Sequence, residues 1–338
     1  MGTYEAGTMT KEVKAGLDAA LKFSEHKFDY MQDVEFYEHN YGLILDEIRK
    51  AESEALAKFG KLGIDKSVIK RIGEYASNLG SDKFLYSHLL DVIYYGLTFW
   101  GERLRAHFID DLITKMLASK KSGQKVHVLG YSLGTALIND AFSKIYRSGA
   151  VDDKHLSTAH HKVDHYWSIA NVSRILHEFN DIDGANPKSN VVHDGVGGCV
   201  KKMTLASHRY DPFMQVKAYA RKPKKGRFHH PSGITQLNTH DLTGYLSHPD
   251  IGLRLIADIY GEDAGINGDV LRKGNENHIK ATVNDDIDGL DAKWQQVLDS
   301  LNDPSGAINS VKVLIEAVDA FREKIKALID EAKPEGDK

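Results

Sequence analysis

Short apolar segments alternate with helix-like segments through the middle of the chain. Four segments are rich in β-branched or aromatic residues and end in loop-forming residues, which is typical of strands. They lie within 125–131, 164–175, 201–213 and 227–242. A helical pattern follows the first of them at 135–148, and another follows the last at 248–261. Strands separated by helices predict an α/β fold whose sheet is mostly parallel and flanked by helices.

The first third of the chain is dominated by helical patterns. Within 10–23, Val13, Leu17 and Leu21 share one stripe, which predicts an amphipathic helix. The alternation of apolar and polar residues in 33–39 predicts a short strand. Further helices are expected at 42–59, 64–79, 87–95 and 102–120, the last of them ended by Gly123.

The last part of the chain has a different pattern. Apolar residues recur in alternating steps of three and four along 287–301 and again along 311–328, with a turn-forming stretch at 302–306 between them. This pattern predicts an antiparallel helical hairpin. We therefore divide the chain into a domain over 1–262 and a helical C-terminal extension over 263–338. The hairpin could pack on the core, which we favour, form a lid, or pair with a second subunit in a homo-oligomer.

Composition narrows the classes of protein that fit this pattern. The 338 residues are 41% hydrophobic and 27% charged, which is ordinary for a globular protein with a sizeable core. The net charge of -4 provides no general basic field, so we do not expect a nucleic-acid partner. We predict neither a leader nor a transmembrane segment, because the apolar window 89–100 is interrupted by Asp91. The single cysteine, Cys199, cannot form an internal disulfide, and we expect a cytoplasmic protein.

The sequence G-Y-S-L-G at 130–134 lies between an expected strand and an expected helix. A sharp strand-to-helix turn presents a serine above the sheet, and glycines on either side of it avoid clashes. In this context Ser132 is a candidate nucleophile, and the backbone N–H of Leu133 is a candidate donor to an oxyanion. An ordinary glycine-rich turn is the alternative interpretation.

A serine hydroxyl needs a base before it becomes a strong nucleophile. Asp211 follows the third expected strand, at the edge where parallel strands place their carboxyl ends. His240 lies in the loop before the 248–261 helix. We assign Asp211 as the residue that orients the imidazole and His240 as the proton acceptor. Weaker rivals are Asp181 and Asp194 for the acid, and His208, His229, His230 and His248 for the base.

With these residues the chain resembles the α/β-hydrolase superfamily, in particular its lipase- and esterase-like serine hydrolases. The resemblance covers about 1–260 and rests on the elbow at 130–134, with Tyr245 and Pro249 matching the pattern that follows the family's histidine. It implies a catalytic triad of Ser132, Asp211 and His240, with hydrolysis of a small-molecule or lipid ester through an acyl-serine intermediate. It implies no metal or organic cofactor.

The chain departs from the family at its beginning. Members of the family have strands and an oxyanion loop before the first helix, whereas here a helix is expected from residue 10. The opening residues resemble the end of such a loop, so Gly2 is the candidate for the second oxyanion donor. The first strands are either truncated or absent. The departure also motivates an alternative function, a catalytically impaired hydrolase-fold protein that acts as a binding or interaction scaffold.

Three other patterns carry less information about function. The glycine-rich stretch 193–198 lacks the strand and spacing of a dinucleotide site. His160, His161 and His165 have a spacing that could suit a metal on a helix, but no carboxylate or cysteine partner accompanies them. The basic run 221–227 predicts a solvated loop, with contact to an anionic lipid or a phosphate as the alternative.

Overall fold

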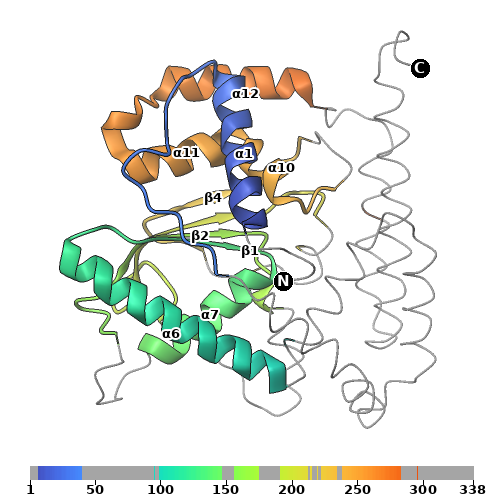
Figure 1. Ribbon diagram of the computed structural model, residues 1–338. Helices are drawn as coiled ribbons and strands as arrows, with labels where there is room; N and C mark the ends of the chain where they lie inside the picture. Colours follow the sequence, from blue (N-terminus) through green and yellow to red (C-terminus); the bar gives the residue numbers. More distant parts are fainter. Residues whose placement is uncertain are drawn as a thin grey trace.

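A computed structural model defines the fold (Figure 1). The residues that it describes are 7–39, 95, 99–146, 156–174, 191–211, 214, 219, 222–233, 238–282 and 295.

The centre of the described part is a four-stranded sheet. All of its neighbouring strands are parallel, in the order β1-β2-β3-β4. The α/β class expected from the sequence is therefore confirmed, and each strand lies within or one residue beyond its expected segment. Because the strands are parallel, the segments that follow them leave from one edge of the sheet. The strands are β1 (His127–Tyr131), β2 (Val163–Ile169), β3 (Val200–Ala206) and β4 (Arg227–His229).

Side chains of β2 contribute to two hydrophobic cores, one on each face of the sheet. Trp167 and Ile169, two residues apart, belong to one core, and Tyr166, whose side chain points to the opposite face, belongs to the other. Val163, the first residue of the strand, joins the core of Tyr166. Each of these four residues is at most 1% exposed. The sheet is thus covered on both faces, which explains why six of the seven residues of β2 are buried.

In the described part of the chain, four helices cover the face of the sheet that carries Trp167 (Figure 1). The helix expected at 10–23 is confirmed as α1, and the buried residues of α1 include the predicted stripe of Val13, Leu17 and Leu21. A short 3₁₀ helix, Gly261–Ala264, links the third and fourth helices of this layer. The helices are α1 (Thr8–Ser24), α10 (Leu242–Ser247), α11 (Pro249–Tyr260) and α12 (Gly268–Ala281).

On the opposite face, the described residues form two covering helices, α6 (Phe99–Ser122) and α7 (Leu133–Tyr146) (Figure 1). The helix α6 ends where the sequence predicts. Gly123 has a φ of 71°, and the next residue, Gln124, donates its N–H to the carbonyl of Ser119 at 2.9 Å. A left-handed glycine with a hydrogen bond that reaches back into the last turn is a common way to end a helix.

The strand predicted at 33–39 is wrong. Residues 34–39 have no regular secondary structure and lie against α6 instead of pairing with a strand. The Tyr37 hydroxyl donates to Asp111 at 3.0 Å, and the Lys115 ammonium lies 4.4 Å from the centre of the Tyr37 ring. The alternation in this segment therefore serves side-chain contacts with a helix, which a sequence pattern does not distinguish from strand pairing.

Several expected elements lie outside the described residues. They are the helices at 42–59 and 64–79, all of 87–95 except Tyr95, and the hairpin over 287–301 and 311–328. In the part of the chain that the structure describes, no helix combines the length and the hydrophobicity needed to cross a bilayer.

Candidate active site

The turn that carries Ser132 joins β1 directly to α7, since β1 ends at Tyr131 and α7 begins at Leu133. Ser132 has a φ of 49°, a left-handed conformation that is uncommon for a residue with a side chain. Its N–H donates to the carbonyl of Ile169 on β2 at 3.1 Å. The turn is therefore fixed by the neighbouring strand, and the serine occupies a strained backbone position of the kind that recurs at functional sites.

The two glycines of the turn meet different surroundings. A Cβ added to Gly130 would lie 2.7 Å from the Cδ1 atom of Ile138 and 3.2 Å from the Tyr166 hydroxyl. A Cβ added to Gly134 would meet no atom within 4 Å, the helix's own nearby backbone aside, in the described part of the chain. The close packing expected on both sides of Ser132 thus exists only at Gly130.

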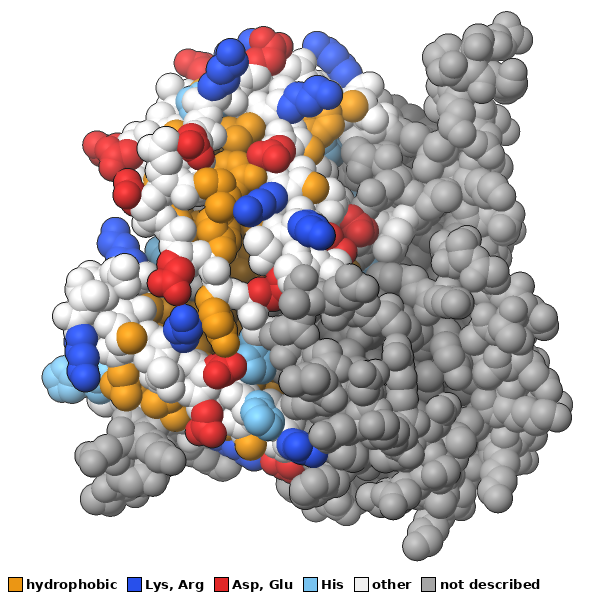
Figure 2. All heavy atoms as spheres, in the orientation of Figure 1, with side chains coloured by type: hydrophobic (Ala, Val, Ile, Leu, Met, Phe, Trp, Pro, Cys, Tyr) orange, Lys and Arg blue, Asp and Glu red, His pale blue; other side chains and the backbone are white. Residues whose placement is uncertain are grey.

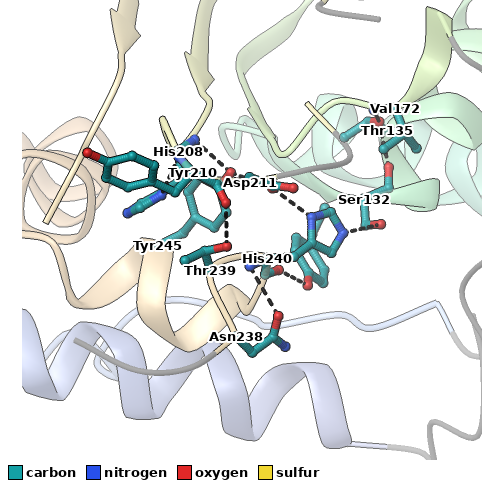
Figure 3. Close-up of polar contacts among 11 residues, drawn as sticks. Ser132, Thr135, Val172, His208, Tyr210, Asp211, Asn238, Thr239, His240 and Tyr245 are labelled. Carbon is teal, nitrogen blue, oxygen red and sulfur yellow. Dashed lines mark hydrogen bonds and ion pairs between the residues drawn. The ribbon is translucent and has the colours of Figure 1, made fainter. Parts of the chain in front are cut away.

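Ser132, His240 and Asp211 form one chain of hydrogen bonds (Figure 3). The His240 Nε2 atom lies 2.8 Å from the Ser132 Oγ, and His240 Nδ1 lies 2.7 Å from Asp211 Oδ2. A carboxylate only accepts hydrogen bonds, so Nδ1 carries the proton and the Nε2 lone pair faces the serine hydroxyl. The three residues are 7%, 1% and 0% exposed, respectively. The arrangement can move a proton from Ser132 to His240 while the carboxylate stabilises the imidazolium.

Loops at one edge of the sheet bring these side chains together. Asp211 follows β3, and its N–H donates to the carbonyl of His208 at 3.1 Å. His240 lies in a turn before α10, where its N–H donates to Asn238 Oδ1 at 3.1 Å. The Thr239 hydroxyl joins the two loops by donating to the carbonyl of Tyr210 at 2.7 Å. The acid and the base are thus held by a direct contact between their own backbone segments.

Two residues that the sequence did not single out support the turn and the base. The Tyr131 hydroxyl donates to the backbone carbonyl of His240, and the two rings lie 5.4 Å apart. The Thr135 hydroxyl donates to the Ser132 carbonyl at 2.6 Å and accepts from the Val172 N–H at 3.2 Å. In the sequence Tyr131 is only the variable position of the G-Y-S-L-G motif. Its partner, the carbonyl of His240, is 109 residues away, so no local pattern predicts this hydrogen bond.

Of the two candidate oxyanion donors, the structure describes Leu133 but not Gly2. Leu133 is the first residue of α7 and is 4% exposed. An N–H group in the first turn of a helix has no partner within the helix and lies at its positive end, so the Leu133 amide can stabilise an anion beside Ser132. Gly2 lies outside the described residues.

Asp194, the rival carboxylate that the structure describes, is not part of the hydrogen-bond chain. Asp194 is 2% exposed and accepts backbone N–H groups from Lys224, Lys225 and Gly226 at 2.7, 2.7 and 2.9 Å. Burial opposes its ionisation, but these three hydrogen bonds outweigh burial and lower the pKa of the carboxyl. Asp194 therefore anchors the described part of the basic run, 222–227. Asp181 lies outside the described residues.

The rival histidines have other contacts. His248 caps the N-terminus of α11 by accepting from the Asp250 N–H at 3.3 Å. His208 Nε2 donates to the carbonyl of Gly233 at 3.1 Å. His229 stacks on Trp167 with ring centres 6.4 Å apart, and burial lowers its pKa to about 4. His230 stacks on its neighbour Phe228.

The three histidines with a possible metal spacing do not lie on a helix. His160 and His161 belong to the turn before β2, and His165 lies within the strand. His165 Nε2 contacts the Thr204 hydroxyl at 2.8 Å, and burial lowers the pKa of His165 to about 3. Among the described residues, no group of three or more His, Cys, Asp or Glu side chains could hold a metal ion.

A hollow on the molecular surface lies away from these side chains. It measures about 630 Å³ and is lined by residues of α1 and of the segment after it, including Leu21, Phe28, Tyr30 and Met31. Figure 2 shows a band of hydrophobic side chains on this side of the molecule. None of the three residues of the hydrogen-bond chain lines the hollow, so we do not assign it to the candidate active site.

Comparison of the chain with protein-family models, with curated proteins and with solved structures found no match. Any functional assignment therefore rests on the geometry of the site and on the sequence motif.

Proposed function

We propose that the protein is a serine hydrolase that cleaves carboxylic esters through an acyl-serine intermediate. One observation carries the proposal, namely the continuous chain from the Ser132 hydroxyl through His240 to Asp211, with distances of 2.8 and 2.7 Å. A hydroxyl, an imidazole in the correct tautomer and a carboxylate are the groups that nucleophilic acyl transfer requires. The strained turn at Ser132 and its position at a helix N-terminus add independent support.

The proposed reaction has two halves. Ser132 Oγ attacks the ester carbonyl carbon while its proton passes to His240 Nε2, and the Leu133 N–H stabilises the oxyanion. The intermediate then expels the alcohol, which takes the proton from His240 and leaves an acyl-serine. Water attacks the acyl-serine with His240 again as the base, and this step releases the acid and restores Ser132. Every proton moves between the substrate, water and side chains of the protein.

The order of the residues along the chain supports an α/β-hydrolase fold, which we propose for the domain over 1–262. Nucleophile, acid and base follow one another as Ser132, Asp211 and His240, the order of that superfamily. The nucleophile follows one strand of a parallel sheet, and the acid follows another strand two places along. The proposed substrate is a small-molecule or lipid ester, since the fold alone does not select the acyl group.

A panel of p-nitrophenyl esters of rising chain length tests this function. We expect turnover by the wild-type protein and a loss of at least about a thousandfold in the Ser132→Ala variant, because the nucleophile is gone. Labelling by a fluorophosphonate should disappear in the same variant. Ser143→Ala is the matched control, since Ser143 lies on α7, the helix that follows Ser132, with its hydroxyl bonded to the carbonyl of Asn139. Turnover that survives in Ser132→Ala would contradict the proposal.

One observation favours the alternative of a binding scaffold. The Leu133 N–H is the only oxyanion donor that we can assign among the described residues, and losing one donor from such a site reduces turnover by about a hundredfold or more. If the wild-type protein is folded, fails to hydrolyse any ester of the panel and fails to react with the fluorophosphonate, the scaffold is the better description.

A further inference from the structure

Tyr245 connects the candidate acid to a neighbouring loop. It lies on α10 and is 1% exposed, in contact with the apolar core between the sheet and the helices. Its hydroxyl lies 2.8 Å from Asp211 Oδ2 and 2.7 Å from the backbone nitrogen of His208 (Figure 3). The sequence indicated Tyr245 only as a match to a family pattern, with no role attached.

The direction of both hydrogen bonds follows from the chemistry of the groups. A backbone N–H can only donate, so the phenol oxygen must accept from His208. A phenol carries a single proton, and this proton is then directed toward Asp211, which accepts it as a carboxylate. If the phenol proton pointed toward the His208 N–H instead, two donors would face each other there, and two acceptors would face each other at Asp211. Tyr245 is therefore oriented as a donor to Asp211 by a backbone group that cannot change its role.

The phenol keeps its proton over the whole useful pH range. Burial and the negative charge of Asp211 raise the pKa of Tyr245 well above its usual value, because both oppose the formation of a phenolate. The hydrogen bond to Asp211 thus persists wherever the carboxyl is ionised.

Tyr245 and His240 share one atom of the acid. The hydroxyl of Tyr245 and the Nδ1–H of His240 both donate to Asp211 Oδ2, at 2.8 and 2.7 Å. Two donors to one oxygen share its negative charge, so the hydrogen bond from each donor weakens the hydrogen bond from the other. We propose that Tyr245 is a positioning residue that holds the Asp211 carboxylate in place and, by donating to the oxygen that His240 also contacts, weakens the interaction of this carboxylate with the imidazolium. This inference rests on the proposed hydrolase function for its catalytic meaning, although its chemistry does not depend on turnover.

The Tyr245→Phe variant removes the phenol proton and retains the ring. Asp211 then interacts more strongly with the imidazolium of His240, so the titration of His240 should move upward by on the order of 0.5–1 pH unit. The shift should appear in the NMR titration of the His240 ring protons. It should also appear in the acid limb of the pH profile of kcat/KM, and the plateau should fall by about tenfold as Asp211 loses one fixed contact.

Tyr146→Phe is the matched control. Tyr146 is also a buried tyrosine, and its hydroxyl donates to a backbone carbonyl, that of His161, at 2.5 Å in the other core. Its removal should leave the titration of His240 unchanged. Replacement of Tyr245 by 3-fluorotyrosine provides a second test that keeps the packing. Fluorine makes the phenol a stronger donor, so the titration of His240 should move downward.

Opposite shifts in the two variants are the result expected from this role, and a residue that only fills space would not produce them. Coincident His240 titrations in the wild-type, Tyr245→Phe and fluorotyrosine proteins overturn the inference. If Tyr245→Phe does not fold, the fluorotyrosine protein decides by itself. If the titrations shift as expected but no Ser132-dependent turnover or labelling is found, the role of Tyr245 stands and the proposed hydrolase function fails.

Discussion

At the level of single residues, the backbone at Ser132 determines what its hydroxyl can do. A left-handed conformation at a residue with a side chain costs about 1–3 kcal/mol and persists only when its neighbours fix it. Here the Ser132 N–H is bound to Ile169, and the Ser132 carbonyl is bound to Thr135 at 2.6 Å. Ala170 repeats the conformation at the end of β2, with a φ of 49° and its N–H on the carbonyl of Ala206 at 2.9 Å. Each strand thus fixes the turn that follows its neighbour.

Alanine substitutions at the two glycines of the turn should have unequal effects. Gly130→Ala should lower the free energy of unfolding by about 1–3 kcal/mol, because its Cβ would crowd Ile138 and Tyr166. Gly134→Ala should be within about 0.5 kcal/mol of the wild type or slightly more stable, since the position is open and helical. Urea denaturation monitored by circular dichroism measures both. Equal losses in the two variants would contradict the packing described at Gly130.

The sequence could predict which residues meet at the candidate site but not how they are held. Asp211 was selected because it follows a strand, and parallel strands end at one edge of the sheet. His240 was selected because it lies in the loop before the helix expected at 248–261. In the structure His240 lies within hydrogen-bond distance of both Ser132 and Asp211. The contacts of Tyr131 and Tyr245 cross 109 and 34 residues, and no periodicity or motif specifies such a pair. The catalytic roles of the three residues stay predictions.

At the level of elements, α12 is held by polar contacts and by two histidines in addition to Val270 and Leu271, which pack against the core. The His278 ring lies 4.6 Å from that of His248 and 5.0 Å from that of Phe23 on α1. The Asn277 amide donates to the carbonyl of Phe23 at 2.8 Å, and Lys273 pairs with Glu25 on the surface. Burial lowers the pKa of both His248 and His278 to about 4. Docking of α12 therefore requires two neutral imidazoles.

This packing predicts a loss of stability in acid. Both histidines titrate near 6.5 when unfolded and near 4 when folded, so the unfolded chain binds more protons between these values. The contribution of each ring is complete above pH 6.5 and declines as the pH falls toward 4, by about 3 kcal/mol for each ring. Asp250 opposes the shift of His248, whereas His208 reinforces the shift of both rings.

Urea denaturation at a series of pH values tests this dependence. The His278→Gln variant should lose part of the slope between pH 6.5 and pH 4, because the remaining ring no longer faces a second one. His160→Gln is the control, since His160 is exposed in the turn before β2. An unchanged slope in His278→Gln would show that the acid sensitivity arises elsewhere.

At the level of the whole molecule, one carboxylate joins the helical layer to three strands. Asp258 on α11 is 9% exposed. It forms an ion pair with Lys202 on β3, lies 3.5 Å from Arg227 on β4, and lies 3.3 Å from His165 on β2. Because the two cations are partly open to water, at 29% and 38%, the pairs are weaker than fully buried ones but still leave Asp258 well compensated.

Asp258→Asn should lower the free energy of unfolding by about 1–3 kcal/mol, because Lys202 and Arg227 would lose their shared counter-charge at the edge of the core. Asp263→Asn, at an exposed position of the 3₁₀ helix, should change it by less than about 0.5 kcal/mol. Thermal or urea denaturation of the two variants at neutral pH provides the comparison. Equal stabilities would mean that α11 is held to the sheet by its apolar contacts alone.

The α/β architecture could be predicted from the sequence more reliably than individual elements such as the segment 33–39 and α12. The α/β class followed from strands and helices that alternate, because buried strands and amphipathic helices differ in period. The strand expected at 33–39 failed because the same alternation serves contacts with α6. Along α12 only Gly274 and His278 are buried, and Val270 and Leu271 are partly buried against the core. Two adjacent apolar residues do not form a repeating pattern, so hydrophobic periodicity does not predict this helix.

The distance along the chain between Ser132 and His240 also determines when the site can exist during synthesis. The two residues are 108 positions apart, which a ribosome covers in about 5 to 20 s. Until His240 has emerged and the strands have paired, Ser132 is an ordinary alcohol with no group to take its proton. A nascent or prematurely ended chain therefore carries the glycine-flanked serine in unreactive form, and the proposed chemistry is confined to molecules whose sheet is complete.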